Sequence, residues 1–293
     1  MTYLLLNTLK DCQSLRRRGL LLVVIIGLLC GQILAAQTTL FQSPTTAMLG
    51  TPGASEKGEW AFFSNPAGLA FLREPVATIG YQNDFNLKEL SSATALLSYP
   101  TKALNISGGY LRSGFEHFNT QQLSLKFSRI MAPWLSLGVG FSHSMSALGA
   151  SEQDKITTMD AGFRLMPNSS LVFGFYTINP AQTKWRKHEY ESYYPSAVAA
   201  SLCYLPHEDL NIEFSILKDI DNDPLASLKL EGKAANAIIL RGTVSGKPLR
   251  LGFGAGLHLD SLHFDMAMNH HRALGFSSAF GISYYFTNLS RNK

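Results

Sequence analysis

Few residues in this 293-residue sequence have the types and spacing needed for catalysis, and the first candidates are a serine beside a histidine. Ser142 and His143 are adjacent within an alternating segment, where consecutive residues of a strand point to opposite faces. A serine nucleophile needs its base within hydrogen-bond reach, so this pair does not form one. The sequence also contains no glycine-rich phosphate loop, zinc-ligand spacing or nucleophile elbow. We therefore expect a protein that is not an enzyme and needs no cofactor.

A second group of polar residues lies near the C-terminus. Arg250, His258, Asp260, His263 and Asp265 occupy alternate positions on either side of a two-residue break. Because facing positions of a hairpin come within side-chain reach, part of this group could bind a metal or form a network of salt bridges and hydrogen bonds. The mixed charges favour the network. We expect it to point into the interior of the fold and to hold no metal.

The segment that carries these residues alternates with a period of two. Residues 249–259, 262–269 and 274–286 place Leu, Phe and Met on one face and Gly, His, Asp and Arg on the other. A soluble sandwich would pack its large apolar side chains inward. Large apolar residues facing outward and small or polar residues facing inward are typical of a transmembrane β-barrel, whose outer surface meets lipid.

The same pattern continues through most of the chain and predicts an all-β fold, a transmembrane antiparallel β-barrel of about 14 strands. The expected strands are Pro75–Tyr81, Ser91–Tyr99, Leu104–Leu111, Gln121–Ile130, Trp134–His143, Ile156–Leu165, Leu171–Ile178, Ser196–Leu205, Leu210–Ile220, Leu225–Gly232, Ala237–Val244, Leu249–Leu259, Leu262–Asn269 and Leu274–Phe286. Short joins alternate with mostly longer ones, as periplasmic turns and outer loops do in bacterial outer-membrane barrels. The even strand number predicts that both ends of the mature chain lie on the periplasmic side.

Aromatic residues near strand ends suit the two interfacial girdles of such a barrel, although aromatics also favour strands in general. They are Tyr81, Tyr99, Tyr110, Trp134, Tyr204, Tyr284, Tyr285 and Phe286.

The first 36 residues have the composition of a secretory signal peptide. Arg16 to Arg18 precede the apolar run Gly19 to Cys30, and small residues follow near Ala36. The apolar run is shorter than the ~20 residues of a spanning helix, and an uncleaved anchor is the alternative. Removing this segment leaves 21 Lys and Arg against 20 Asp and Glu, because four of the 25 basic and one of the 21 acidic residues leave with it. This balance gives no support for a nucleic-acid partner.

Residues 37–74 do not alternate. They contain Ala47 to Gly50 and then the run Asn65, Pro66, Ala67, Gly68, Leu69 and Ala70. Asn followed by Pro suits the N-cap and first turn of a short connecting helix. The order of these segments, followed by an alternating barrel, also resembles the FadL superfamily of long-chain fatty-acid transporters. It is more closely similar to the PorV/PorQ branch, which is associated with type IX secretion in Bacteroidetes-like bacteria.

This resemblance implies that residues 37–74 fold into the barrel lumen as a hatch, with Asn65, Pro66, Ala67, Gly68 and Leu69 as its motif. The expected organisation is a signal peptide (1–36), a hatch (37–74), an outer-membrane β-barrel (75–286) and a C-terminal tail (287–293). The resemblance favours a non-enzymatic component or adaptor of a type IX-like secretion assembly in the outer membrane of a Gram-negative, Bacteroidetes-like bacterium. The alternative is a FadL-like transporter or binder of hydrophobic small molecules.

The inward face of the expected barrel carries charges of both signs. By alternation these are Lys126, Asp160, Arg164, Glu213, Lys229, Glu231, Arg250, His258, Asp260, His263 and Asp265. Unpaired charges in an enclosed space are costly, so mixed charges favour a lumen filled by salt bridges over an open channel. Several glycines also face inward, among them Gly138, Gly140, Gly252, Gly254, Gly256 and Gly281. They could admit a hatch or a slim apolar ligand to the wall, or serve the curvature of the strands.

The segment between Asn179 and Pro195 is the expected outer loop most suited to a partner. Trp185, Arg186, Tyr190 and Tyr193 combine aromatics with arginine, a composition enriched at protein interfaces. A loop that covers the mouth of the barrel is the alternative. The expected partners are therefore outer-membrane lipid and either secretion-system proteins or a hydrophobic small molecule.

Overall fold

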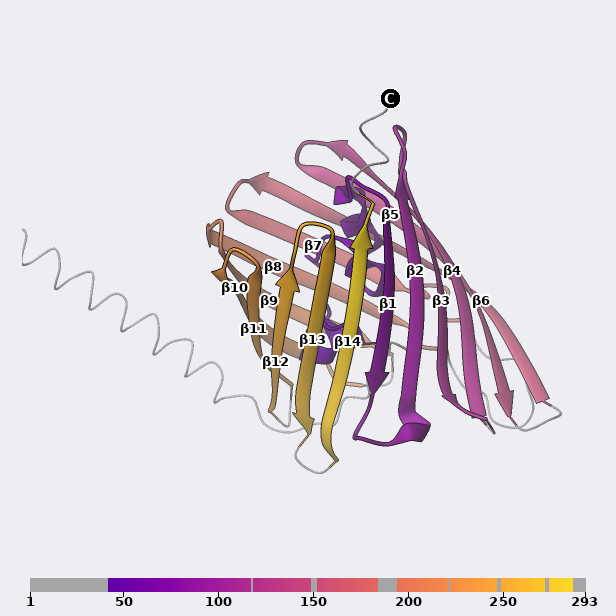
Figure 1. Cartoon of the computed structure of the whole chain (residues 1–293). Coiled ribbons are helices and arrows are strands. Elements are labelled where there is room, and N and C mark those ends of the chain that lie inside the picture. The colour runs from indigo at the N-terminus through magenta and orange to yellow at the C-terminus, as the bar shows by residue number, and fades with distance from the viewer. Residues whose placement is uncertain are drawn as a thin grey trace, which may run out of the picture.

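The computed structural model describes residues 42–116, 118–148, 152–183, 194–220, 222–246, 249–271 and 274–286. These residues form a closed antiparallel barrel of fourteen strands that follow one another around the wall in chain order (Figure 1). The strands are β1 (Val76–Asn83), β2 (Ser91–Pro100), β3 (Asn105–Phe115), β4 (Phe118–Ala132), β5 (Leu135–Leu148), β6 (Glu152–Asn168), β7 (Leu171–Ile178), β8 (Ala197–His207), β9 (Leu210–Asp219), β10 (Leu225–Ala235), β11 (Ile238–Ser245), β12 (Arg250–His258), β13 (Leu262–His271) and β14 (Gly275–Tyr285). The predicted fold class is confirmed.

The first and last strands close the barrel. Val76 of β1 lies opposite Tyr285 of β14, and the pairing continues to Asn83 opposite Ser278. Closure leaves no free sheet edge along this seam, and every backbone group on these two strands has a neighbour to bond. No helix among the described residues is long and apolar enough to cross a membrane.

Alternation along each strand produces the two surfaces of the wall. Leu123 of β4 and Phe253 of β12 face outward and are 65% and 60% exposed. Their chain neighbours Ser124 and Gly252 face inward and are buried. The protein is thus apolar where a lipid bilayer would contact it and lined mainly with Ser, Thr, Gly and charged residues inside, the reverse of a soluble sandwich.

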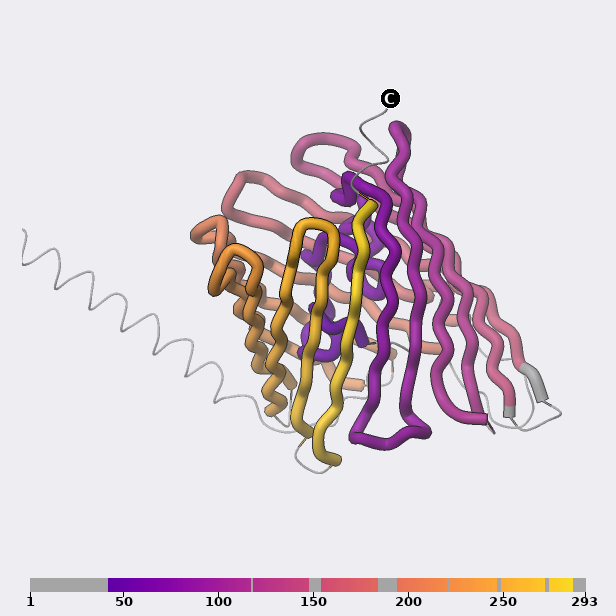
Figure 2. The backbone as a smooth tube through the Cα atoms, in the orientation of Figure 1, coloured from indigo at the N-terminus to yellow at the C-terminus, as the bar shows by residue number. Residues whose placement is uncertain are grey.

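The two ends of the barrel differ. At one end, here called the turn end, hairpins such as residues 259–261 between β12 and β13 are short. At the other, the loop end, residues 84–90 form a longer connection that contains η4 (Lys88–Leu90), and the described residues 179–183 and 194–196 follow β7 and precede β8. Figure 2 shows these hairpins as a smooth trace, with the β1–β2 connection at the bottom and the C-terminal end of β14 at the top.

Strands β4, β5 and β6 are longer than predicted. Residues 112–120 and 144–155 were expected to be outer loops, but most of them extend these strands and their neighbour β3 beyond the apolar belt. In this region both faces of the sheet carry polar residues, so the alternation that marks a membrane strand is lost although the backbone pairing continues.

Exposed aromatics lie near both ends of the wall. Tyr81 and Tyr110 are close to the loop end, and Tyr99, Trp134 and Tyr204 are close to the turn end, each between 44% and 54% exposed. The expectation for Tyr285 was wrong. It faces inward and donates a hydrogen bond to Glu59, because alternation places its neighbour Tyr284 outward.

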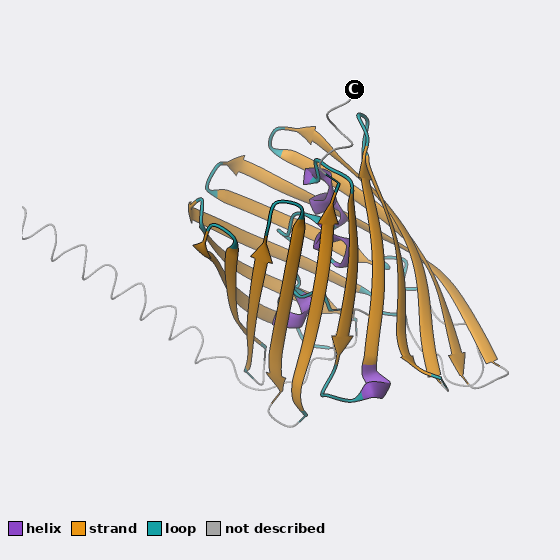
Figure 3. Cartoon of the chain, in the orientation of Figure 1, coloured by secondary structure: helices purple, strands orange, loops and turns teal. Residues whose placement is uncertain are grey.

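A plug formed by residues 42–74 fills much of the interior. It contains three short 3₁₀ helices, η1 (Ala47–Leu49), η2 (Glu59–Phe63) and η3 (Pro66–Phe71), which lie inside the cage of strands (Figure 3). The backbone N of Gln42 donates to Oε1 of Gln82 at 2.6 Å, near the loop end of β1. The described plug therefore runs from the loop end to the turn end, where it joins β1. Gln42, the first described residue, thus lies at the loop end, whereas both ends of the mature chain were expected at the turn end.

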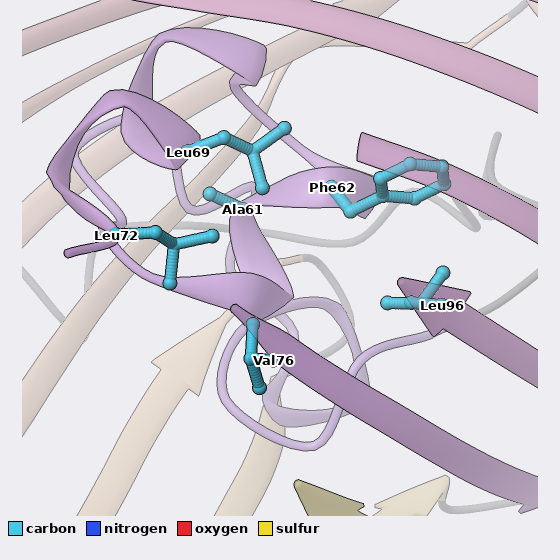
Figure 4. Packing of buried hydrophobic residues seen from close by; sticks show 6 residues of the cluster. All are labelled: Ala61, Phe62, Leu69, Leu72, Val76 and Leu96. Atoms are coloured by element: carbon cyan, nitrogen blue, oxygen red, sulfur yellow. The ribbon is translucent and has the colours of Figure 1, made fainter. Parts of the chain in front are cut away.

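The apolar core lies between the plug and the wall and not between two sheets. Phe62 from η2 and Leu69 from η3 pack with Leu72, with Val76 of β1 and with Leu96 of β2 (Figure 4). Burying such side chains contributes roughly 1.5–3 kcal/mol each, so the plug and the first two strands stabilise each other.

Candidate functional site

Glycines on the inner wall lie where the plug makes its closest approach. At Gly138 of β5 an added Cβ would collide with the backbone of Pro66 and Ala67, and at Gly281 of β14 it would collide with the ring of Trp60. These positions therefore admit the plug backbone and side chains directly against the strands. At these positions the inward glycines make room for the hatch, which is one of the roles expected from the sequence. A larger residue there would displace the plug.

The side chain of Asn65 makes hydrogen bonds both within the plug and to the barrel wall. Its Oδ1 accepts a hydrogen bond from the backbone N of Ala67 at 3.0 Å, which caps η3. Its Nδ2 donates to the carbonyl oxygens of Ala54, at 2.7 Å, and of Phe163 in β6, at 2.9 Å. The side chain is fully buried. Asn65 and Pro66 thus begin a capped helix, as the sequence predicts. The side-chain amide of Asn65 also holds the plug against β6.

The rest of the predicted motif supports the same contact. Pro66 begins η3, where its missing N–H costs nothing. Gly68 leaves room for the carbonyl of Glu56. The carbonyl of Leu69 accepts a hydrogen bond from Nδ2 of Asn105 in β3 at 2.6 Å. Motif residues therefore make both internal plug contacts and contacts to the wall.

A buried ionic cluster holds the plug to strands β9 and β10. Nζ of Lys229 lies 3.2 Å from Oε2 of Glu56 in the plug and 3.6 Å from Oε2 of Glu213 in β9. Glu213 also accepts hydrogen bonds from Ser55 at 2.5 Å and from Ser215 at 2.7 Å. One lysine is thus shared by two carboxylates, and the hydroxyl donors favour Glu213 as the charged one. Burial raises the pKa of the Glu56 carboxyl to about 7, although Lys229 opposes this shift.

A second part of the cluster joins strands β10 to β13. Arg241 places Nε 2.8 Å from Glu231 and Nη1 2.8 Å from Asp265. Nε2 of His258 lies 3.2 Å from the same Asp265 carboxylate, and Nε1 of Trp60 in the plug donates to it at 3.3 Å. Asp265 is therefore the point where wall and plug meet. All of these charges have partners, so the turn end of the interior carries a paired ionic network.

The predicted polar network is only partly assembled in the structure. His258, His263 and Asp265 come together, and the two imidazole rings stack with centroids 4.1 Å apart. Asp260 lies exposed in the hairpin turn, outside this group, because strict alternation ends there. Arg250 lies at the opposite end of β12, eight residues from His258, so it is also outside the group. Among the described residues, no cluster of three or more His, Cys, Asp or Glu could hold a metal.

Two central residues of the cluster were not predicted. Arg241 alternates inward on β11 between Ile239 and Thr243, a signal that the same alternation rule could have found. Glu56 lies in the non-alternating plug, where no periodicity indicates direction. Only the folded chain brings it to Lys229, 173 residues away in sequence.

A cavity of about 60 Å³ lies on the loop-end side of the plug. Its apolar lining includes Phe62 and Phe63 of the plug, Leu111 of β3 and Ile178 of β7. Its polar lining is formed by the ion pair between Lys126 and Asp160 and by hydroxyl and amide groups, namely Thr94, Gln122, Ser124, Ser142, Thr158 and Tyr194.

The ion pair in this cavity is held close to the plug. Nζ of Lys126 is 3.1 Å from Oδ2 of Asp160 and 5.1 Å from the ring centroid of Phe62. Both charged side chains are buried. A ligand in this cavity could therefore place an apolar part against the phenyl rings and a polar group against the opposite wall.

A second, larger cavity of about 1020 Å³ opens at the turn end below the plug. Its lining contains the ionic cluster, including Glu56, Lys229 and Arg241, together with the turns near Ser170 and Asp209. The plug therefore separates the small cavity on its loop-end side from this wider one, whose lining carries the ionic cluster.

The four residues of the predicted partner loop, Trp185, Arg186, Tyr190 and Tyr193, lie outside the described residues. So do the predicted signal peptide and the C-terminal tail after Phe286. At the end of the partner loop, Tyr194 is buried and its hydroxyl bonds Ser144 at 3.0 Å and Gln122 at 3.3 Å.

No protein-family model matches this chain, and no curated protein matches it. Several solved structures share its fold. A FadL homologue from Pseudomonas aeruginosa is 13% identical with a TM-score of 0.60, over 88% of this chain and 100% of that one. The P. putida toluene transporter TodX is 11% identical with a TM-score of 0.63, over 78% and 94% of the two chains. A further TodX structure is 12% identical with a TM-score of 0.57, over 86% and 97%.

These comparisons concern the fold of the chain. The similar structures are a FadL homologue and a toluene transporter, and neither supports the PorV/PorQ branch or a secretion partner. At such low identity the likeness shows the fold alone. The chain has the fold of the FadL-type barrels, with a plug inside a closed wall of fourteen strands.

Proposed function

We propose that this chain is an outer-membrane barrel of a Gram-negative bacterium that binds and transports small hydrophobic molecules. The observation that carries the proposal is the cavity between the plug and strands β3 to β7, because two phenyl rings of the plug form one side of it. A hydrophobic molecule that enters the barrel from the loop end meets this surface first.

The outer surface supports the location. Large apolar side chains are exposed around the wall, and aromatics lie at both ends of this belt. Only a closed barrel or a helix satisfies its backbone within lipid. Short turns on one side and longer loops on the other are typical of outer-membrane barrels whose turn end lies in the periplasm and whose loop end lies outside, which supports this orientation.

The cavity also limits the kind of ligand. A volume of about 60 Å³ leaves no space for a long acyl chain while Phe62 and Phe63 hold their present positions. The lining combines apolar rings with Lys126, Asp160 and several hydroxyl groups. A single-ring molecule, with or without one polar substituent, matches this lining better than a fatty acid does. Entry then requires the two phenyl rings to move, which links ligand binding to the plug.

Binding can be tested with Trp60 as the reporter, because it packs with Phe63 and Leu111, two residues of the cavity lining. Trp134 and Trp185, the other two tryptophans, are replaced by Phe, and the purified protein is titrated with toluene, phenol and octanoate. We expect saturable changes in fluorescence with toluene and phenol, and weaker ones with octanoate.

A pair of substitutions on β5 separates the cavity from the rest of the wall. Ser142 lines the cavity, whereas its neighbour Phe141 faces outward and is 48% exposed. Ser142→Leu fills the cavity and should lower toluene affinity at least tenfold, while Phe141→Leu should leave it unchanged. Equal binding by both variants, or no saturable binding by the parent protein, would refute the proposed site. Membrane fractionation tests the location separately.

A further inference from the structure

The tall wall formed by strands β3 to β6 carries basic residues on its outer face just above the apolar belt. Arg112 on β3 and Lys155 on β6 are exposed there. Register places Arg112 opposite Gln121, Gln121 opposite Met145, and Met145 opposite Lys155, so these residues form one row across four strands. Strands are about 4.8 Å apart, which separates the two basic residues by about 14 Å.

Hydrogen-bonding groups lie directly beneath this row. His143 on β5 faces outward, and its Nδ1 lies 2.9 Å from Oγ1 of Thr157 on β6. The hydroxyl of Tyr110 donates to Oε1 of Gln121 at 3.0 Å. Leu123 lies in the same row as His143, and the next outward row below is apolar, with Leu125, Phe141 and Met159. The polar groups therefore occupy the level at which lipid headgroups would meet the barrel.

The charged residues on this outer face are basic. Within the described parts of β3 to β6, no Asp or Glu faces outward. The ion pairs formed by described side chains do not include Arg112 or Lys155. The nearest carboxylates along the chain are Glu116, exposed in the β3–β4 connection, and Asp154, whose Oδ1 accepts a hydrogen bond from the backbone N of Lys155.

We infer that this outer face binds a phosphorylated glycolipid of the outer leaflet, with phosphates at Arg112 and Lys155 and sugar hydroxyls at the groups between them. A guanidinium binds phosphate through two parallel hydrogen bonds, and an ammonium attracts it as a point charge. The acyl chains would then lie on the apolar belt below. The inference rests on the proposed outer-membrane location, because it takes the loop end to face the outer leaflet.

The test uses the full-length protein in zwitterionic phosphatidylcholine nanodiscs, with retained lipid measured by native mass spectrometry. The probes are bisphosphorylated lipid A, the same glycolipid with its phosphates removed, and phosphatidylglycerol. The test variant carries both Arg112→Ser and Lys155→Ser. The control variant carries both Arg129→Ser and Lys102→Ser, and it removes one exposed Arg and one exposed Lys near the turn end.

We expect the parent protein and the turn-end variant to retain bisphosphorylated lipid A equally. The Arg112 and Lys155 variant should bind it roughly ten- to thirtyfold more weakly, since each basic residue near an anionic headgroup contributes on the order of a fivefold change. The dephosphorylated glycolipid should bind all three proteins alike and weakly. Equal retention by both double variants would overturn the inference, and so would binding of phosphatidylglycerol as tight as that of lipid A.

These results are distinguishable from failure of the proposed transport function. Neither Arg112 nor Lys155 lines the cavity at the plug, so the Arg112 and Lys155 variant should keep toluene binding. Fractionation that places the chain outside the outer membrane would remove the biological setting, whereas the nanodisc comparison would still report the phosphate dependence of the surface.

Discussion

At the scale of single residues, buried polar side chains in this protein connect the plug to the wall. Asn65, Glu56 and Trp60 each reach a strand from the plug, and each has its partner in the interior. Removing one partner from a buried pair leaves the other unsatisfied, which costs more than the net contribution of the hydrogen bond itself. Substitutions at these positions should therefore loosen the plug while leaving strand pairing intact.

Replacement of Asn65 by Ala should destabilise the docked plug by roughly 2–4 kcal/mol, because three hydrogen bonds are lost and the carbonyls of Ala54 and Phe163 each lose a donor. Hydrogen exchange measured by mass spectrometry should show faster exchange in residues 54–69 and little change in β10 to β14. The control is Asn83→Ala, which removes an exposed contact to the carbonyl of Leu87. Unchanged exchange in the plug of the Asn65 variant would contradict the bridging role.

Glu56 should make the stability of the plug depend on pH. Its folded pKa of about 7 lies above the ordinary 4.5, so between these values the folded state retains a proton that the unfolded state has lost. The contribution of Glu56 to stability should therefore be greatest below about pH 4.5, decrease as the pH rises to about 7, and then level off. A shift of this size corresponds to at most roughly 3 kcal/mol.

Glu56→Gln should abolish this slope, because an amide cannot titrate. The measurement is the protection of residues 54–69 from hydrogen exchange at pH 5, 6, 7 and 8, after correction for the intrinsic rate. A slope of the same size in the Gln variant would assign the pH dependence to other groups of the cluster.

At the scale of elements, the inner wall is shaped to receive the plug. Gly138 on β5 is in contact with the plug backbone, whereas an added Cβ at Gly108 on β3 would meet nothing within 4 Å. The two glycines therefore test different properties. Only the first can report on plug docking, because both substitutions change the backbone freedom of a strand in the same way.

Gly138→Val should displace η3 from the wall and open a path for small ions, whereas Gly108→Val should be silent. Single-channel conductance in planar bilayers measures the difference. We expect brief openings in the first variant and none in the parent protein or in the second. If Gly108→Val opened the barrel equally, the effect would belong to the strand and not to the contact with the plug.

At the scale of the whole molecule, the plug closes a wall that would otherwise surround a polar channel. The wall is complete without it, because β1 pairs with β14 along eight residue pairs. Water and ions would fill the lumen once the plug was absent, since its lining is made of Ser, Thr and charged residues.

Deletion of residues 42–74 should therefore leave a barrel that inserts into bilayers and conducts ions continuously. The cost is the loss of the apolar core around Leu69 and Phe62, so the variant should also unfold at lower urea concentration than the parent protein. Conductance traces and urea titrations in vesicles test both parts. A variant that inserts and remains closed would show that something other than the plug blocks the lumen.

The wall could be predicted from the sequence because it depends on a local rule. Alternation at each strand fixes which residues meet lipid and which face inward, and it correctly placed Lys126, Asp160 and Lys229 inside. The alternation rule failed in two places that are not membrane strands. Asp260 was expected to face inward but lies in a turn. The loop-end parts of β4 to β6 were expected to be loops, because they carry polar residues on both faces.

The plug and its contacts were decided only by the tertiary structure. A non-periodic segment has no preferred face, so its sequence indicated a capped turn at Asn65 but not the strand that Nδ2 would bind, nor that the described plug would begin at the loop end beside Gln82. The meeting of Glu56 with Lys229 depends on closure of the barrel, which brings together residues far apart in the chain. The same holds for the small cavity lined by Phe62, because it forms only where the plug and the wall leave space between them.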